Sequence, residues 1–547
     1  MPEQLNYLFK EWNEYDQIRR DLDAGKGPVS LSGCIDAAKP HLISGFGEEK
    51  KWKLVITYNE TRAKELYEDS QFYGRDVWLY PAKDLLFYNA DIQGKLLVRQ
   101  RMTVIRQLLE GRAGVIITAV DGCMDHLLRL ERIRERILIL REGESRSVEE
   151  IRQELVYLGY EHVFQVEGPG QFCIRGGILD VFGLTDENPV RVEFWGDEID
   201  SIRGFEAESQ RSIESLEEIR IYPASEVLLT GDVLKDGADR IEKECRQYVR
   251  ALRDQMRTEE AARIRSNVDM LLEELQEGFM THGLDGYVRY FYEDTVSLLD
   301  YFSQEDTFTV LDEPVRIFQR AEAVELEFRE SMSHRLEKGY LLPGQTSILY
   351  ETKDVMRRME RPAAFCMCGL DQKAPLIKVN RKYNIMIKNV SSYQSSFEEL
   401  IKDLKHWKRD RYRVVLLSNS GTRAMRLAED LKEYELDSFY RPDFDEAVNP
   451  GRILVTCGKL HKGFEYPFLR FVVITEGDMF GVKKKARKKK HTYEGKKIQS
   501  FSDLSVGDYV IHENHGLGIF RGIEKVEIGS TRQNSSHIRR SRMPSSA

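Results

Sequence analysis

The chain has 547 residues, a formal charge of −9 at pH 7 and 41% hydrophobic residues, a composition typical of a folded protein with several domains. No apolar run approaches the roughly 20 residues that a membrane span requires, and the charged start of the chain is unlike a signal peptide. The seven scattered cysteines predict free thiols in a reducing compartment, so we expect a cytoplasmic protein with no membrane partner.

Residues 1–29 are predicted to form an N-terminal helix, and the segment after them resembles a phosphate-binding loop, G-x-x-x-x-G-K-[ST]. Gly33 and Lys39 occupy two positions of this motif, but Ala38 replaces its second glycine and Pro40 replaces its Ser/Thr. Proline offers neither a hydroxyl group to Mg²⁺ nor an N–H group to a phosphate. The segment therefore predicts either a degenerate nucleotide site or an ordinary strand-to-helix connection.

From residue 30 to 137, short β-rich runs alternate with helical runs, which predicts a parallel α/β sheet. Residues 224–370 are expected to form the second part of this domain, because a strand returns at Phe308–Leu311 after a long charged helical stretch. Asp312 and Glu313 follow this strand, where a nucleotide-binding protein would hold Mg²⁺, but the next residues do not continue a helicase box. Both halves of a nucleotide site are thus degenerate, while a solvated strand end would equally explain the two acids alone.

Residues 138–223 contain strands separated by turn residues, which predicts a small antiparallel α+β domain inserted into the first one. Alternation in VRVEFW gives this strand one apolar face and one charged face that carries Arg191, Glu193 and Trp195. An exposed indole among charges is typical of a protein-binding hot spot. A second interpretation, in which the helix SVEEIRQELVYLGY covers this face, is equally good.

The last part of the chain predicts a further domain, a linker and a small β-rich segment. Residues 375–478 alternate four strands, the first of them NIMIKNV, with helices, which predicts a second α/β domain. A basic linker is expected over residues 479–497, and its cations either hold phosphates or form a plain tether. Residues 498–529 predict part of a small β-barrel of the Tudor/SH3 type, and residues 530–547 predict a disordered tail.

Five segments in this order closely resemble the bacterial transcription-repair coupling factor family, Mfd, over nearly all of residues 1–529. These segments are GPGQFCIRGGILDVF, VRVEFWGDEIDSIRGFE, SLLDYF…LDEPVRI, GFEYPFLRFVVITEGDMFG and GDYVIHENHGLGIFRGIEKVEI. The resemblance implies an α/β multidomain fold: a UvrB-like, degenerate RecA-type parallel-sheet domain with an inserted α+β domain, a second α/β domain and a truncated β-barrel.

The resemblance also implies sites and partners. The family binds UvrA through its inserted domain, and the matching residues here are Arg175, Arg191 and Trp195. The relic of the ancestral nucleotide site corresponds to Gly33, Lys39, Asp312 and Glu313. The domain that docks on the β subunit of RNA polymerase corresponds in part to Val510, His512, Gly516 and Ile519.

The chain also departs from the family pattern. The resemblance implies that two RecA-like motor domains, which use ATP and Mg²⁺, and a domain covering the UvrA-binding face are missing. We therefore expect a truncated factor of nucleotide excision repair that docks UvrA without catalysis, cofactor or metal, binds DNA weakly if at all, and keeps only part of the polymerase contact. The alternatives are a UvrB-like DNA-dependent ATPase or helicase, and a nucleic-acid-binding fragment that acts through Lys483–Lys497.

Overall fold

The computed structural model describes residues 2–83, 95–276, 284–393, 396–442, 447–481, 509–512, 516–528 and 531–540. The chain forms two compact units, Met1–Val482 and Lys483–Ala547. Among the described helices, none has the length and apolar character needed to cross a bilayer. The basic run Lys483–Lys497 lies outside the described residues.

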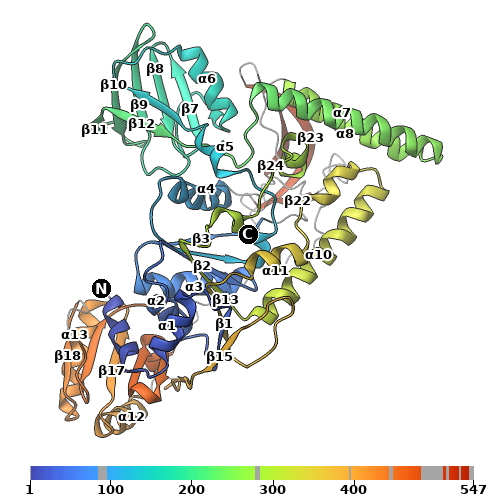
Figure 1. The fold of residues 1–547 in the computed structure, drawn as a ribbon. Helices are drawn as coiled ribbons and strands as arrows, with labels where there is room; N and C mark the ends of the chain where they lie inside the picture. The colour runs from blue at the N-terminus through green and yellow to red at the C-terminus, as the bar shows by residue number, and fades with distance from the viewer. Residues whose placement is uncertain are drawn as a thin grey trace, which may run out of the picture. The chain divides into compact units, whose positions relative to one another are not determined.

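A parallel sheet of seven strands forms the centre of the first unit (Figure 1), as the sequence predicted. Its strands are β1 (Val29–Ser32), β2 (Trp52–Thr57), β3 (Val77–Tyr80), β4 (Gly114–Ala119), β13 (Thr307–Asp312), β14 (Ala364–Cys368) and β15 (Arg381–Asn384). The order β15-β1-β14-β13-β2-β4-β3 places β13 and β14, which come late in the chain, between β1 and β2. The carboxyl ends of β1 and β13, where the suspected nucleotide residues lie, therefore share one edge of the sheet.

Helices cover both faces of this sheet, which explains why its central strands β13 and β14 are buried along their whole length. One face packs against α2 (Lys39–Gly45) and α3 (Glu60–Tyr73), and Asn59 caps α3 by accepting a hydrogen bond from the Arg62 amide. The opposite face is covered by α4 (Lys95–Leu109), α10 (Pro314–Glu337) and α11 (Thr352–Met359).

A second sheet, of six strands, lies within the segment predicted as an inserted α+β domain. Its strands are β6 (Glu161–His162), β7 (Gln171–Arg175), β8 (Ile178–Phe182), β9 (Val190–Trp195), β10 (Glu198–Phe205) and β11 (Ser212–Leu216). They are joined in the order β11-β10-β9-β8-β7-β6, antiparallel except for the β6–β7 pair. Helix α6 (Val148–Tyr157) packs on one face, and β5 (Leu138–Arg141) pairs with β12 (Glu218–Ile221) at the base.

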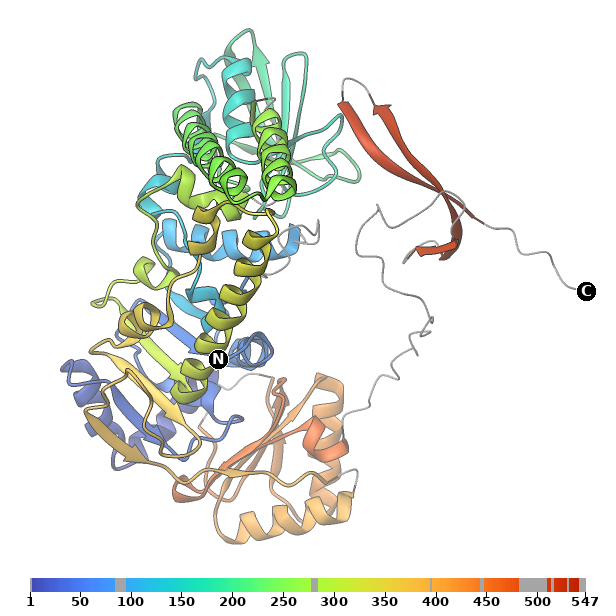
Figure 2. The same ribbon diagram turned by 90° about the vertical axis from the view of Figure 1, so that its right-hand side faces the viewer.

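Mostly helical segments connect β12 to β13 and β13 to β14. Helices α7 (Gly231–Asp254) and α8 (Thr258–Gln276) run side by side as a hairpin, which Figure 2 shows in green. The short elements of the first unit are η1 (Pro2–Glu11), α1 (Tyr15–Asp23), η2 (Val120–Cys123), α5 (Leu130–Arg134), η3 (Leu284–Tyr287), α9 (Val288–Phe291), η4 (Leu298–Tyr301), η5 (Pro343–Ser347) and η6 (Pro467–Leu469).

A third sheet, mixed and six-stranded, contains β16 (Lys388–Asn389), β17 (Arg413–Ser418), β18 (Ser438–Tyr440), β19 (Ile453–Cys457), β20 (Phe464–Tyr466) and β21 (Phe471–Thr475). Its order is β16-β20-β21-β17-β19-β18, and β21, β17, β19 and β18 run parallel. Helices α12 (Phe397–Arg409) and α13 (Gly421–Glu433) cover one face, and α14 (Glu476–Phe480) follows β21.

Two sequence-based boundaries are wrong. The run NIMIKNV is not one strand. Strand β15 ends at Asn384 and belongs to the first sheet, whereas β16 belongs to the third sheet. The buried residues Ile385 and Ile387 lie between these two short strands. The predicted N-terminal helix is two helical segments, η1 and α1, with a break at Trp12–Asn13. Asparagine has a weak helix propensity, which favours this break.

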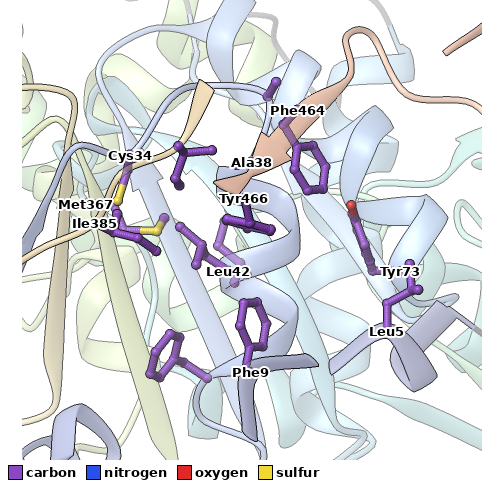
Figure 3. Packing of buried hydrophobic residues seen from close by; sticks show 14 of the residues in the cluster. Leu5, Phe9, Cys34, Ala38, Leu42, Tyr73, Met367, Ile385, Phe464 and Tyr466 are labelled. Carbon is purple, nitrogen blue, oxygen red and sulfur yellow. The ribbon is translucent and has the colours of Figure 1, made fainter. Parts of the chain in front are cut away.

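The open face of the third sheet packs against α2 and α3 in one continuous apolar core (Figure 3). Leu5 and Phe9 of η1, Leu42 of α2, and Phe464 and Tyr466 of β20 all belong to this core. The third sheet is therefore fixed to the first through the helix that follows the degenerate phosphate loop.

His41 is buried inside this core. Its Nδ1 lies 3.3 Å from the hydroxyl oxygen of Tyr466, and its ring stacks on Phe9 with centroids 4.5 Å apart. Burial lowers the pKa of His41 to about 3, so the imidazole is neutral in the folded protein.

The second unit contains a three-stranded antiparallel sheet of β22 (Tyr509–His512), β23 (Gly516–Ile528) and β24 (Thr531–Arg540). The predicted disordered tail is therefore wrong for residues 531–540. Only two residues, Gly529 and Ser530, separate β23 from β24, and their number and type are typical of a hairpin. Backbone pairing does not require alternating apolar residues, which β24 lacks. Residues 541–547 lie outside the described residues, and a closed Tudor/SH3-like barrel stays a prediction.

We predict that His41 makes the first unit acid-sensitive. The unfolded chain takes up a proton near the ordinary pKa of about 6.5, whereas folded His41 does not until about pH 3. The contribution of His41 to the free energy of unfolding is therefore fully present above about pH 6.5. This free energy decreases as the pH falls towards 3, by about 2 kcal/mol between pH 7 and pH 5. Urea unfolding of wild type and His41→Phe at both pH values measures this loss, and equal pH dependence in the two proteins would contradict it.

Candidate functional site

The side chain of Lys39 is fully buried at the edge where β1 and β13 end. Its ammonium group donates to Asp312 Oδ1 at 2.6 Å, to Glu313 Oε1 at 2.7 Å and to Asp36 Oδ1 at 3.0 Å. Burial alone would lower the pKa of Lys39, but the carboxylates of Asp312, Asp36 and Glu313 outweigh it and raise the pKa. The amine is therefore a permanent internal cation.

Asp312 is held on its second oxygen as well. Its Oδ2 accepts from Thr57 Oγ1 at 2.7 Å and from Arg62 Nε at 3.3 Å, and the residue is fully buried. Both carboxylate oxygens thus have partners within the protein, as a buried charge requires.

Three carboxylates of this cluster form a donor set that could suit a divalent cation. Asp36, Asp312 and Glu313 bring oxygens within 4.8 Å of one another, and oxygen ligands are those that Mg²⁺ prefers. The ammonium of Lys39, however, already contacts all three carboxylates. The lysine of the degenerate loop thus occupies the three acids that could otherwise hold a metal ion.

Gly33 and Glu313 both have a positive φ angle in this arrangement. Gly33 has φ +83°, and a Cβ atom there would lie 1.9 Å from the carbonyl oxygen of Ile385, so only glycine lets the chain after β15 approach. Glu313 has φ +59°, and its side chain accepts from the Gly369 amide at 2.7 Å. The structure brings Lys39, Asp312 and Glu313 together, whereas Gly33 supports the neighbouring chain segment.

Sequence reasoning missed three members of this cluster: Asp36, Thr57 and Arg62. Arg62 follows the Asn59 cap of α3 and reaches both Asp312 and the backbone oxygen of Asp36. An arginine on a helix face that otherwise packs on the sheet was the available signal for a buried ion pair.

The charged face of β9 is open. Val192 and Phe194 are buried with Ile151 and Leu155 of α6, so the helix covers the apolar face. Trp195 lies on the opposite face and is 84% exposed. The interpretation in which this helix covers the tryptophan is therefore excluded.

Two arginines share this open face with Trp195. Arg191 donates to Asp180 through Nε at 2.6 Å and a terminal nitrogen at 2.9 Å, and Arg175 donates to the same carboxylate at 3.0 Å. Arg175 and Trp195 are each the last residue of a strand that ends in a tight hairpin. Ile178 of β8 lies opposite Glu193 of β9, and this register places both hairpins at the same end of the sheet. The structure thus brings the three predicted residues to one face and adds Asp180, which the sequence reading did not identify.

The four residues matched to the polymerase-interacting domain lie on β22 and β23. His512 pairs with Gly516, Val510 with Gly518, and Ile519 with Tyr509. All four are therefore in the first hairpin of the second unit.

We predict that Lys39 stabilises the first unit. Replacing it in Lys39→Met keeps most of the side-chain volume but leaves buried Asp312 without its ammonium partner, which costs about 3–5 kcal/mol. Chemical denaturation compares this variant with Lys64→Met, which removes an exposed lysine from α3 and should leave stability nearly unchanged. Equal midpoints for the two variants would contradict a buried ion pair at Lys39.

Comparisons with known proteins agree with this architecture. Residues 138–227 match the UvrB interaction domain, and residues 504–539, which include most of β24, match the CarD-like/TRCF RID domain. The second match thus extends beyond residue 529, where the resemblance seen in the sequence ends.

Matches to whole proteins cover almost the entire chain. A transcription-repair-coupling factor of Bacillus subtilis is 30% identical over 539 residues, which are 98% of this chain and 45% of that protein. Its counterpart in Staphylococcus epidermidis is 28% identical over 539 residues, 96% of this chain and 44% of that protein. The chain spans about half the length of these relatives. Over that span, it is similar to the transcription-repair-coupling factors.

Proposed function

We propose that this chain acts as a docking module of nucleotide excision repair, which binds UvrA through the face of Arg175, Arg191 and Trp195 and has no nucleotide-driven activity of its own. The observation that carries the proposal is the largely exposed indole of Trp195 beside two arginines on the sheet face that α6 does not cover. The match of residues 138–227 to the UvrB interaction domain supports the same face.

The chemistry of this face suits a protein partner. Tryptophan and arginine are the residues that most often dominate the energy of protein interfaces, because they combine a large apolar area with directed hydrogen bonds. The sheet behind them is rigid, since its other face packs on α6. The side chains are therefore presented with little entropy to lose on binding.

The cluster around Lys39 supports the second half of the proposal. A phosphate would need a free lysine and free backbone N–H groups, but Lys39 is committed to three carboxylates and Pro40 has no N–H group. Binding a nucleotide would require breaking a buried ion pair. This geometry opposes the alternative of a UvrB-like ATPase.

We further propose RNA polymerase as a second partner through the β22–β23 hairpin. The match of residues 504–539 to the CarD-like/TRCF RID domain supports this assignment. A module with both contacts would link a polymerase to UvrA without any motor step of its own.

Trp195→Ala should weaken UvrA binding by about 2 kcal/mol or more, because truncating a central aromatic anchor removes its packed area. Biolayer interferometry with immobilised UvrA and the full chain measures this change. The matched control is Met256→Ala, which truncates an equally exposed side chain in the turn between α7 and α8. Equal affinity of wild type and Trp195→Ala would remove this face from the interaction.

MgATP should not bind to the cluster of Lys39, Asp312 and Glu313. Isothermal titration calorimetry of the full chain with millimolar MgATP is expected to show no saturable heat, because the lysine is already paired with the acids in a buried cluster. Saturable micromolar binding that disappears in Lys39→Met would instead support the UvrB-like ATPase.

A further inference from the structure

Asp180 is an unusual residue for its position. It lies in β8, a strand with neighbours on both sides, between Leu179 and Val181 of the apolar core, and its side chain is only 2% exposed. A buried carboxylate is costly unless it is paired and hydrogen-bonded. Here three donors meet it: Arg191, Arg175 and the Cys173 thiol, whose sulfur lies 3.8 Å from Oδ2.

The two arginines are held to different degrees. Arg191 has two bonds to Asp180, a third to Gln210 Oε1 at 3.1 Å, and its guanidinium lies 4.6 Å from the centroid of the Phe205 ring. Arg175 has one bond to Asp180, and its side chain is 45% exposed. Arg191 is thus locked in place, whereas Arg175 depends on Asp180 for its orientation and still has donors free for a partner.

We propose that Asp180 is a positioning residue of the docking face: its single buried carboxylate orients both Arg175 and Arg191, so that they meet the partner together with Trp195. The inference rests on the proposed function of this face. Asp180 itself is too buried to touch UvrA and acts through the arginines.

The same contacts define the chemistry of the partner. One carboxylate faces two guanidinium groups, so this part of the face keeps one net positive charge. Glu193 and Arg203, which neutralise each other nearby, add none. The complementary surface on UvrA should therefore carry an acidic side chain beside an apolar pocket for the indole.

The test is a double-mutant cycle of Asp180→Asn and Arg175→Ala, with UvrA binding kinetics of the full chain as the readout. Asp180→Asn should weaken binding about tenfold through faster dissociation, because the arginines lose their fixed orientation. Association at low salt should not slow, since removing a negative charge makes the face more positive. Arg175→Ala should clearly weaken UvrA binding in the wild-type background but should weaken it little further in the Asp180→Asn background. A general loss of stability would not produce such non-additivity.

The control is Glu193→Gln, which removes an acid from the same face without touching either docking arginine. If Asp180→Asn does not fold, Asp180→Glu replaces it in the cycle, because it keeps the charge but moves the carboxylate by one methylene. Additive effects of the two substitutions, or an Asp180 variant that binds like wild type, would overturn the positioning role. If wild type does not bind UvrA, or Trp195→Ala binds equally well, the proposed function itself fails.

Discussion

The ion pair between Lys39 and Asp312 is the constraint on which the first unit depends. It joins the start of α2 to the end of β13, two elements that meet at the carboxyl edge of the sheet but lie far apart in the chain. Because both groups are buried, neither can be removed alone without leaving an uncompensated charge. The same α2 carries Leu42 into the core shared with the third sheet (Figure 3), so the segment that resembles a phosphate loop acts as a structural joint.

The docking face follows the same principle with a different outcome. In both places a buried carboxylate collects basic side chains: Asp312 with Lys39 and Arg62, and Asp180 with Arg175 and Arg191. Around Asp312 the bases are buried, and the cluster holds the fold together. Around Asp180 the bases lie nearer the surface beside Trp195, and in the proposed docking face the cluster would present them to a partner. Burial of the bases thus separates a structural cluster from a recognition surface.

Periodicity in the sequence was sufficient for the parallel sheet, the antiparallel sheet and the two faces of β9, because alternation decides which residues are buried. It was insufficient where two short strands adjoin, as at Asn384 and Lys388, since each is too short to show its own period. It also missed β24, whose pairing comes from backbone hydrogen bonds rather than side-chain pattern. The degenerate motif identified Lys39, Asp312 and Glu313, but it did not point to Asp36, which lies three residues before Lys39, or to Arg62 and Asp180, which join their clusters through tertiary contacts.

The central claim is that this chain works through docking rather than through nucleotide chemistry. Hydrogen–deuterium exchange of the full chain, measured alone, with UvrA and with MgATP, tests both halves on one sample. The account predicts slower exchange with UvrA in residues 171–205, and unchanged exchange with MgATP in residues 33–45. Protection of residues 33–45 by MgATP, or of no residues in β7–β10 by UvrA, would contradict it.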